Sequence, residues 1–150
     1  MDTSSLTIHP ATEADIPAIL DLYGQAGLDE EPMPLEDAIA QWRIICSYPH
    51  YAIYVALQEH QIVGTFALLI MENLIHGGQS SGIVESVAVH PAYQGQGIGK
   101  AMMQNAMQHC RAHNCYKLTI SANAIRTHAH QFYETLGFQK HGYSFHMDLQ

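Results

Sequence analysis

The most informative stretch is G-I-V-E-S-V-A-V-H-P-A-Y-Q-G-Q-G-I-G-K-A, which runs from Gly82 to Ala101. Its first part is apolar and β-branched, as expected of a buried strand. Glycines at 95, 97 and 99 follow a His-Pro pair, and a helix-period pattern begins at Ile98. A strand that leads through a glycine-rich turn into a helix exposes main-chain amides where the helix macrodipole is positive. The stretch therefore predicts a site for phosphate groups.

Two common nucleotide-binding turns do not match this spacing. A Rossmann turn needs G-x-G-x-x-G and an acidic residue about twenty residues later, whereas these glycines lie at i, i+2 and i+4. A P-loop needs four residues between its first glycine and Gly-Lys, and then Ser or Thr. Only 96–98 separate Gly95 from Gly99, and Ala101 has no hydroxyl group. A glycine-rich turn without a ligand is the other alternative.

The same residues resemble motif A of the GCN5-related N-acetyltransferases (GNAT), which is written R/Q-x-x-G-x-G/A. The resemblance implies that the loop and the helix start bind the pyrophosphate of acetyl-coenzyme A, and that the preceding strand binds its pantetheine arm through main-chain amides. The implied loop ligands are Gln94, Gly95, Gln96, Gly97, Ile98, Gly99 and Lys100, and the strand ligands are Val87, Ala88 and Val89.

Length and composition favour one domain over residues 1–150. The chain has 47% apolar and 13% charged residues, which is typical of a compact globule. Its net charge of −8 comes from 14 acidic against 6 basic residues and argues against a nucleic-acid partner. No signal peptide is present at the N-terminus, and no apolar run is long enough to span a bilayer. We therefore expect a cytoplasmic protein without a membrane partner.

The cysteines and histidines do not predict a metal centre. Cys46, Cys110 and Cys115 are odd in number and lack C-x-x-C spacing, so we expect reduced thiols. His109 and His113 lie four residues apart but have no third ligand at a recognisable spacing. We expect no metal cofactor.

Hydrophobic periodicity predicts the secondary structure. Thr12 to Asp15 reads as a capping box, and Ile98, Met102, Ala106 and Cys110 would line the core face of one helix. We expect strands near 6–8, 51–57, 62–71, 83–89 and 116–120, a final alternating strand at 143–149, and helices near 16–23, 35–47, 97–113 and 129–136. This order predicts an α/β (α+β) fold with a mixed, mainly antiparallel sheet and about four helices, as in GNAT proteins.

A second segment, Ala129–Phe138, resembles GNAT motif B, A-x-x-F-Y-x-x-x-G-F. The resemblance implies that Tyr133 protonates the departing thiolate of coenzyme A. Attack of an amine on a thioester expels a thiolate that benefits from a proton donor, and a phenol with a pKa of about 10 stays protonated at neutral pH. Tyr133 also falls on the apolar face of its helix, so core packing is the alternative.

The attacking amine must be neutral, which favours a nearby base. Glu85 lies four residues before Val89 on the predicted central strand, where many GNAT proteins carry a carboxylate. An ordinary surface carboxylate is an equal alternative, and Glu72 and His90 are weaker candidates for the base. Many relatives place Asn at the position of Arg126, and Asn123 lies three residues earlier. Both are therefore candidate cofactor ligands, although Arg126 could instead bind an anionic group of the substrate or be an ordinary solvated arginine at a helix start.

The acceptor amine is not determined by these motifs. Tyr93–Gly97 and Cys115–Leu118 resemble glucosamine-6-phosphate acetyltransferases, and R-x-x-A-H-x-F-Y from Arg126 occurs in aminoalkylphosphonate acetyltransferases. The acidic loop Asp29–Glu31 would instead suit a cationic amine. We expect acetyl transfer to a primary amine of a small molecule, with a homodimer as one possible assembly. A protein N-terminus or lysine as acceptor, and an acyl-coenzyme A-binding module without catalysis, are the alternatives.

Overall fold

The computed structural model describes residues 5–121 and 127–150, so the predicted ligands Asn123 and Arg126 lie outside the described residues. The chain divides into two compact units, Met1–Thr119 and Ile120–Gln150. Within the described residues, the first unit contains three α-helices and almost all of the sheet, and the second contains one α-helix and the C-terminal segment. A single domain over residues 1–150 stays a prediction.

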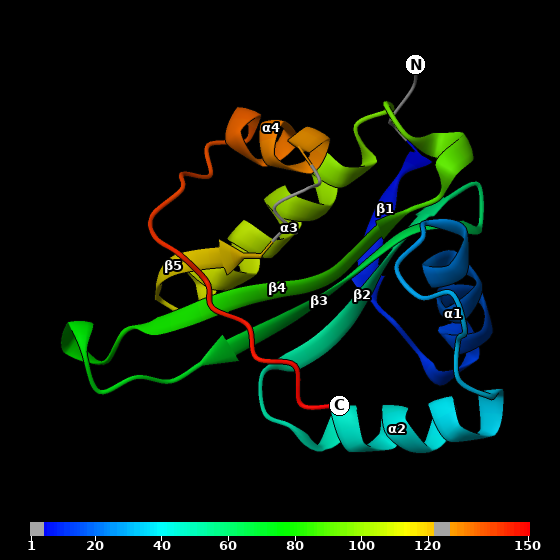
Figure 1. Ribbon diagram of the computed structural model, residues 1–150, viewed down its shortest axis with the longest axis horizontal. Coiled ribbons are helices and arrows are strands. Elements are labelled where there is room, and N and C mark those ends of the chain that lie inside the picture. The colour runs from blue at the N-terminus through cyan, green and yellow to red at the C-terminus, as the bar shows by residue number, and fades with distance from the viewer. Residues whose placement is uncertain (1–4, 122–126) are drawn as a thin grey trace. The chain divides into compact units, whose positions relative to one another are not determined.

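The first unit is built on a five-stranded sheet in the order β1-β2-β3-β4-β5 (Figure 1). Strands β1 to β4 pair antiparallel with their neighbours in sequence, whereas β5 reaches the edge beside β4 through a crossover helix. This arrangement confirms the predicted mixed, mainly antiparallel sheet. The bounds are β1 Thr7–Pro10, β2 Tyr51–Gln58, β3 Gln61–Met71, β4 Ser80–Val89 and β5 Cys115–Ile120.

The described residues contain four α-helices, the number predicted: α1 Ile16–Gln25, α2 Leu35–Ser47, α3 Ile98–Ala112 and α4 Thr127–Thr135. Consecutive strand residues point to opposite faces, so β2 shows how the helices of the first unit are distributed. Tyr54 has its ring 4.8 Å from that of His109 on α3. Val55 instead belongs to a buried cluster with Ile19 of α1, against which Trp42 of α2 packs. Helix α3 therefore covers one face of the sheet, and α1 and α2 cover the other.

Two turns of the first unit have local structure that can be assigned to single residues. The Thr12 amide donates to the Asp15 carboxylate at 2.8 Å, which confirms the capping box ahead of α1. Glu59 and His60 join β2 to β3 with φ values of 52° and 66°, the left-handed pair typical of a tight hairpin. The predicted core face of α3 is also confirmed, because all four of its residues are buried: Ile98, Met102, Ala106 and Cys110.

The predicted final strand is wrong. Residues 139–150 form no helix or strand, and the side chains of Tyr143, Phe145, Met147 and Leu149 are 79% to 94% exposed. Alternation specifies which side chains share a face, but a strand is stable only when another strand takes up its main-chain hydrogen bonds. Within the described residues, none of the helices is long and apolar enough to cross a membrane.

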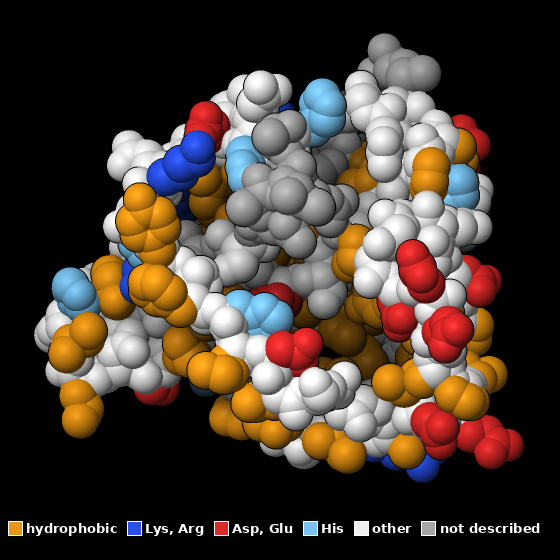
Figure 2. All heavy atoms as spheres, in the orientation of Figure 1, with side chains coloured by type: hydrophobic (Ala, Val, Ile, Leu, Met, Phe, Trp, Pro, Cys, Tyr) orange, Lys and Arg blue, Asp and Glu red, His pale blue; other side chains and the backbone are white. Residues whose placement is uncertain are grey.

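Acidic side chains gather over α1 and the start of α2 (Figure 2). Arg43 of α2 pairs with Glu13 at 3.3 Å, so its charge is already balanced by a carboxylate. This part of the first unit therefore presents a negative field to solvent. The exposed acidic residues of the α1–α2 connection and of the first turn of α2 are Asp29, Glu30, Glu31, Glu36 and Asp37.

Candidate active site

The predicted phosphate loop joins β4 to α3 and contains two glycines in the left-handed region. Gly95 has a φ of 78° and Gly97 a φ of 83°, conformations that residues with a Cβ adopt only at a free-energy cost. An added Cβ at either position would meet nothing within 4 Å. The loop therefore needs glycine for the direction of its main chain and not for space.

The N-terminus of α3 is open. Gly97 is the N-cap residue, and no described side chain caps the helix there. The Ala101 amide makes the first intrahelical bond, to the Gly97 carbonyl at 3.0 Å, so the amides of Ile98, Gly99 and Lys100 precede the helical ladder. The Ile98 side chain is buried against the sheet and Lys100 is exposed. These amides, the helix dipole and the lysine together suit an anionic ligand.

Hydrogen bonds anchor the loop to the β2–β3 hairpin. The His90 amide donates to the Val63 carbonyl at 2.8 Å, and the Tyr93 hydroxyl donates to Gln61 Oε1 at 3.2 Å. His90 Nδ1 accepts from the Ala92 amide at 3.1 Å and so caps the short 3₁₀ helix Pro91–Tyr93. His90 thus has a structural role, which weakens it as a candidate base. Of the two loop glutamines, Gln94 is exposed and Gln96 is half-buried.

A β-bulge interrupts β4 where the predicted strand ligands begin. Thr65 lies opposite Ala88 and Ala67 opposite Glu85, so one residue of β3 spans two residues of β4. Ser86 takes up the irregularity with a φ of 53°, which is unusual for a residue other than glycine. A bulge disrupts the ladder and redirects the strand. The bulge contains Val87 and is followed immediately by Ala88 and Val89, so it coincides with the predicted pantetheine ligands, a feature that the sequence did not predict.

The exposed side chain of Glu85 lies on the face of the sheet that α1 and α2 cover. Ile53, Ala67 and Glu85 form one cross-strand row, and Ile53 packs against the cluster that contains Ile19. Glu72 lies just beyond the end of β3 and is also exposed. Glu85 is therefore next to the bulge whereas Glu72 is not, which favours Glu85 of the two candidate bases.

Tyr133 lies on α4 in the second unit. Its ring makes edge contacts with Phe132 at 5.3 Å and Phe138 at 5.8 Å between centroids. Its carbonyl accepts the amide of Phe138 at 3.1 Å, and Gly137 ends the helix with a φ of 97°. Motif B is therefore a helix end folded around the tyrosine. The loop and Tyr133 belong to different units, so the approach of the phenol to a thioester stays a prediction.

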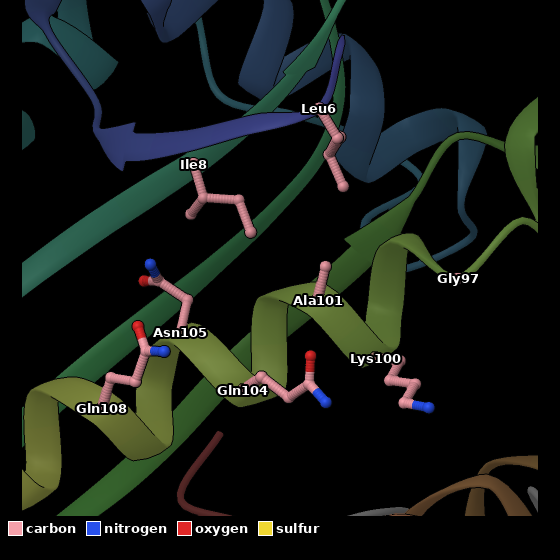
Figure 3. A pocket seen from close by; sticks show the side chains of 8 residues that line it. All are labelled: Leu6, Ile8, Gly97, Lys100, Ala101, Gln104, Asn105 and Gln108. Carbon is pink, nitrogen blue, oxygen red and sulfur yellow. The ribbon is translucent and has the colours of Figure 1, made fainter. Parts of the chain in front are cut away.

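The first three turns of α3 also border a pocket of about 550 Å³ on the side of β1 (Figure 3). Asn105 points toward β1, and its Oδ1 is buried with no hydrogen-bond partner in the described structure. Sequence reasoning did not single out this pocket, which shares Gly97 and Lys100 with the phosphate loop. Its other lining residues are Leu6, Ile8, Ala101, Gln104, Asn105 and Gln108.

No group of three or more His, Cys, Asp or Glu side chains among residues 5–121 and 127–150 is arranged to hold a metal ion. His109 packs on Tyr54, and its carbonyl lies 3.0 Å from His113 Nδ1. The two histidines therefore have contacts of their own within the first unit.

A bulged strand, a left-handed glycine turn and an open helix start follow one another on a mixed sheet, and this geometry suits an anionic ligand. Residues 16–138 match the model of the acetyltransferase (GNAT) family. The chain belongs to this family and is an acetyltransferase, which confirms the resemblance and the predicted enzyme class.

Three comparisons show how far the similarity extends. Glucosamine 6-phosphate N-acetyltransferase of Trypanosoma brucei brucei is 31% identical over 99% of both chains. Aminoglycoside N(6′)-acetyltransferase type 1 of Stenotrophomonas maltophilia is 26% identical over 93% of this chain and 90% of its own. The structure of a putative acetyltransferase from Agrobacterium tumefaciens str. C58 superposes with a TM-score of 0.89 at 26% identity, covering 95% of this chain and 99% of that one. The fold is thus shared over almost the entire chain.

Gly97→Ala tests the loop. Because a Cβ meets no neighbour there, the substitution acts through the left-handed φ, which costs about 1–2 kcal/mol for an L residue. The free loop can relax but must regain its shape to bind, so we expect the Kd for coenzyme A, measured by calorimetry, to rise about tenfold. Gly142→Ala is the matched control, since its φ is not left-handed and a Cβ there meets open space. Equal affinities of the two variants would rule out this role of Gly97.

Proposed function

We propose that this protein transfers the acetyl group of acetyl-coenzyme A to a primary amine of a small molecule by direct attack of the amine on the thioester. The observation that carries the proposal is the open N-terminus of α3, which follows a left-handed glycine turn and the bulged end of β4. Membership of the GNAT family implies acetyl-coenzyme A as the donor. The same geometry suits the pyrophosphate of that donor.

Each proposed site residue would have its own role in acetyl transfer. The amides of Gly97 to Lys100 would hold the pyrophosphate, and those of Val87 to Val89 would hold the pantetheine arm and polarise the thioester carbonyl as negative charge develops. Tyr133 would protonate the departing thiolate. Glu85 would accept the proton of the amine, directly or through water.

The acceptor follows from two different arguments. Two relatives are named for glucosamine 6-phosphate and for aminoglycosides, both of which are small molecules with primary amines. The exposed carboxylates of the α1–α2 side favour a cationic acceptor of the second kind, because a negative surface repels a phosphate ester. Both classes belong in the test.

The test is release of free coenzyme A thiol from acetyl-coenzyme A in the presence of a panel of amines. The panel contains glucosamine 6-phosphate, an aminoglycoside, a peptide with a free N-terminus and a peptide with an internal lysine. We expect turnover with one of the two small-molecule classes. Turnover with peptides alone would identify a protein acetyltransferase. Cofactor binding without thiol release from any amine would favour the non-catalytic module.

Glu85→Gln tests the proposed base. An amine with a pKa of about 10 is almost entirely protonated at pH 7, so removal of the base should lower kcat/KM there by about tenfold to a hundredfold. The deficit should shrink as the pH rises, because the amine then loses its proton in solution. The measurement is the pH profile of kcat/KM, with Glu59→Gln at the exposed β2–β3 turn as the control. If Glu85→Gln leaves the pH profile of kcat/KM unchanged, Glu85 is an ordinary surface carboxylate and not the base.

A further inference from the structure

Two of the three cysteines lie together where α3 passes into β5. Cys110 is in the last turns of α3 and is 4% exposed, and Cys115 is the first residue of β5 and is half-buried. The turn between them is short, because the His113 amide bonds back to the carbonyl of Cys110 at 3.2 Å and that of Asn114 to Arg111 at 3.1 Å. The two thiols lie close enough for each to shift the pKa of the other.

The two thiols differ in their environment. Burial, together with the neighbouring Cys115 thiol, raises the pKa of Cys110 to about 12. Burial also raises the pKa of Cys115, but there the interaction with Cys110 acts in the opposite direction and favours the thiolate. Cys115 is therefore the thiol that is both reachable and better able to act as a nucleophile.

We propose that Cys110 and Cys115 are a modification site, at which a low-molecular-weight disulfide such as oxidised glutathione converts the pair into an intramolecular disulfide. In the first exchange the Cys115 thiolate attacks one sulfur of the glutathione disulfide, forms a mixed disulfide and releases one glutathione thiolate. In the second, the sulfur of Cys110 gives up its proton, attacks the Cys115 sulfur and releases the second glutathione. The two protein thiols are oxidised and one glutathione disulfide is reduced to two thiols.

The bond would connect α3 to β5 at the far end of β4 from the phosphate loop. Cys110 packs against Gly82 of β4, while Val89 and the loop lie beyond the bulge at the other end of the strand. A covalent link here restricts the unfolded chain and ties the crossover helix to the sheet edge. The disulfide would therefore act as a staple on the fold and leave the residues proposed for cofactor binding untouched.

The test uses the whole protein and peptide mapping. The reduced protein is incubated with excess oxidised glutathione, remaining thiols are alkylated in denaturant, and the chain is cut with trypsin without reduction. Because trypsin cleaves after Arg111, the disulfide would hold the peptides Ala101–Arg111 and Ala112–Lys117 together. We expect this linked pair, with Cys46 found only as a glutathione adduct or alkylated. We also expect a rise in Tm of about 5 °C that a reductant reverses.

Single substitutions provide the controls. Cys115→Ser should leave Cys110 as an alkylated thiol, and Cys46→Ser should still give the linked peptides. Two results would overturn the proposal: a stable glutathione adduct on Cys115 beside an alkylated Cys110, or disulfide-linked dimers through Cys46 in place of the internal bond. A disulfide that forms but lowers Tm would contradict the role as a staple.

Discussion

Tyr133→Phe should lower kcat by about a hundredfold or more while the KM for acetyl-coenzyme A stays within about twofold. The substitution removes only the hydroxyl group and keeps the ring, so the edge contacts with Phe132 and Phe138 are preserved. A loss of turnover would then be assigned to the missing proton donor and not to packing. The measurement is steady-state release of coenzyme A thiol with the best acceptor from the amine panel.

The pH profile gives a second readout that a packing role would not affect. A general acid is active only while it is protonated, so wild-type kcat should fall as the pH rises through the pKa of the phenol. This limb should be missing from the residual activity of Tyr133→Phe. Tyr143→Phe is the matched control, because Tyr143 lies in the same unit and is fully exposed to solvent. It should behave as wild type.

Retained activity in Tyr133→Phe would exclude a role of the phenol as the proton donor. If Tyr133→Phe keeps kcat within a few-fold of wild type and retains the alkaline limb, then the phenol is only a packing residue of the α4 end. The thiolate would in that case leave unprotonated or take its proton from water. Cofactor binding at the α3 loop would stay unaffected, since no loop residue is changed.

Some parts of the candidate site are determined by neighbouring residues in the sequence, and others by contacts between distant residues. The turn at Gly95 and Gly97 and the buried face of α3 follow from glycine spacing and helical periodicity, which are properties of neighbouring residues. The bulge at Ser86 has no such signal, because serine has no preference for a positive φ. It arises from the register between β3 and β4, where Thr65 and Ala67 are fixed in the buried sheet. A one-residue offset must then be absorbed on β4.

The prediction of a final strand was wrong because strand pairing, like the bulge, depends on residues that are distant in the sequence. Tyr143, Phe145, Met147 and Leu149 have the periodicity of a strand, but periodicity does not supply a hydrogen-bonding partner. Tyr133 shows a third case, since motif B was recognised from the sequence, whereas Tyr133 and the loop belong to two separate units. Local patterns thus predicted the elements, and the contacts between distant strands decided the details of the site.

Gly82→Ala should destabilise the protein by about 2–3 kcal/mol, which corresponds to a fall in Tm of about 5–10 °C. Gly82 is buried on β4, and a Cβ there would overlap the sulfur of Cys110 and lie 3.1 Å from Leu118 Cδ1. Helix α3 and strand β5 therefore approach β4 so closely that only glycine fits between them. The measurement is thermal and urea unfolding of the variant against wild type.

Two comparisons assign the effect to that close approach. Gly64→Ala places a Cβ 2.9 Å from Met102 Sδ, but the end of a methionine side chain can move aside, so this variant should lose less stability than Gly82→Ala. Cys110→Ala combined with Gly82→Ala removes the sulfur that the new methyl group would overlap. The double variant should therefore be more stable than the sum of the single effects predicts, by about 1 kcal/mol. Additive effects, or an unchanged Tm for Gly82→Ala, would show that the layers between α3 and the sheet can separate without loss.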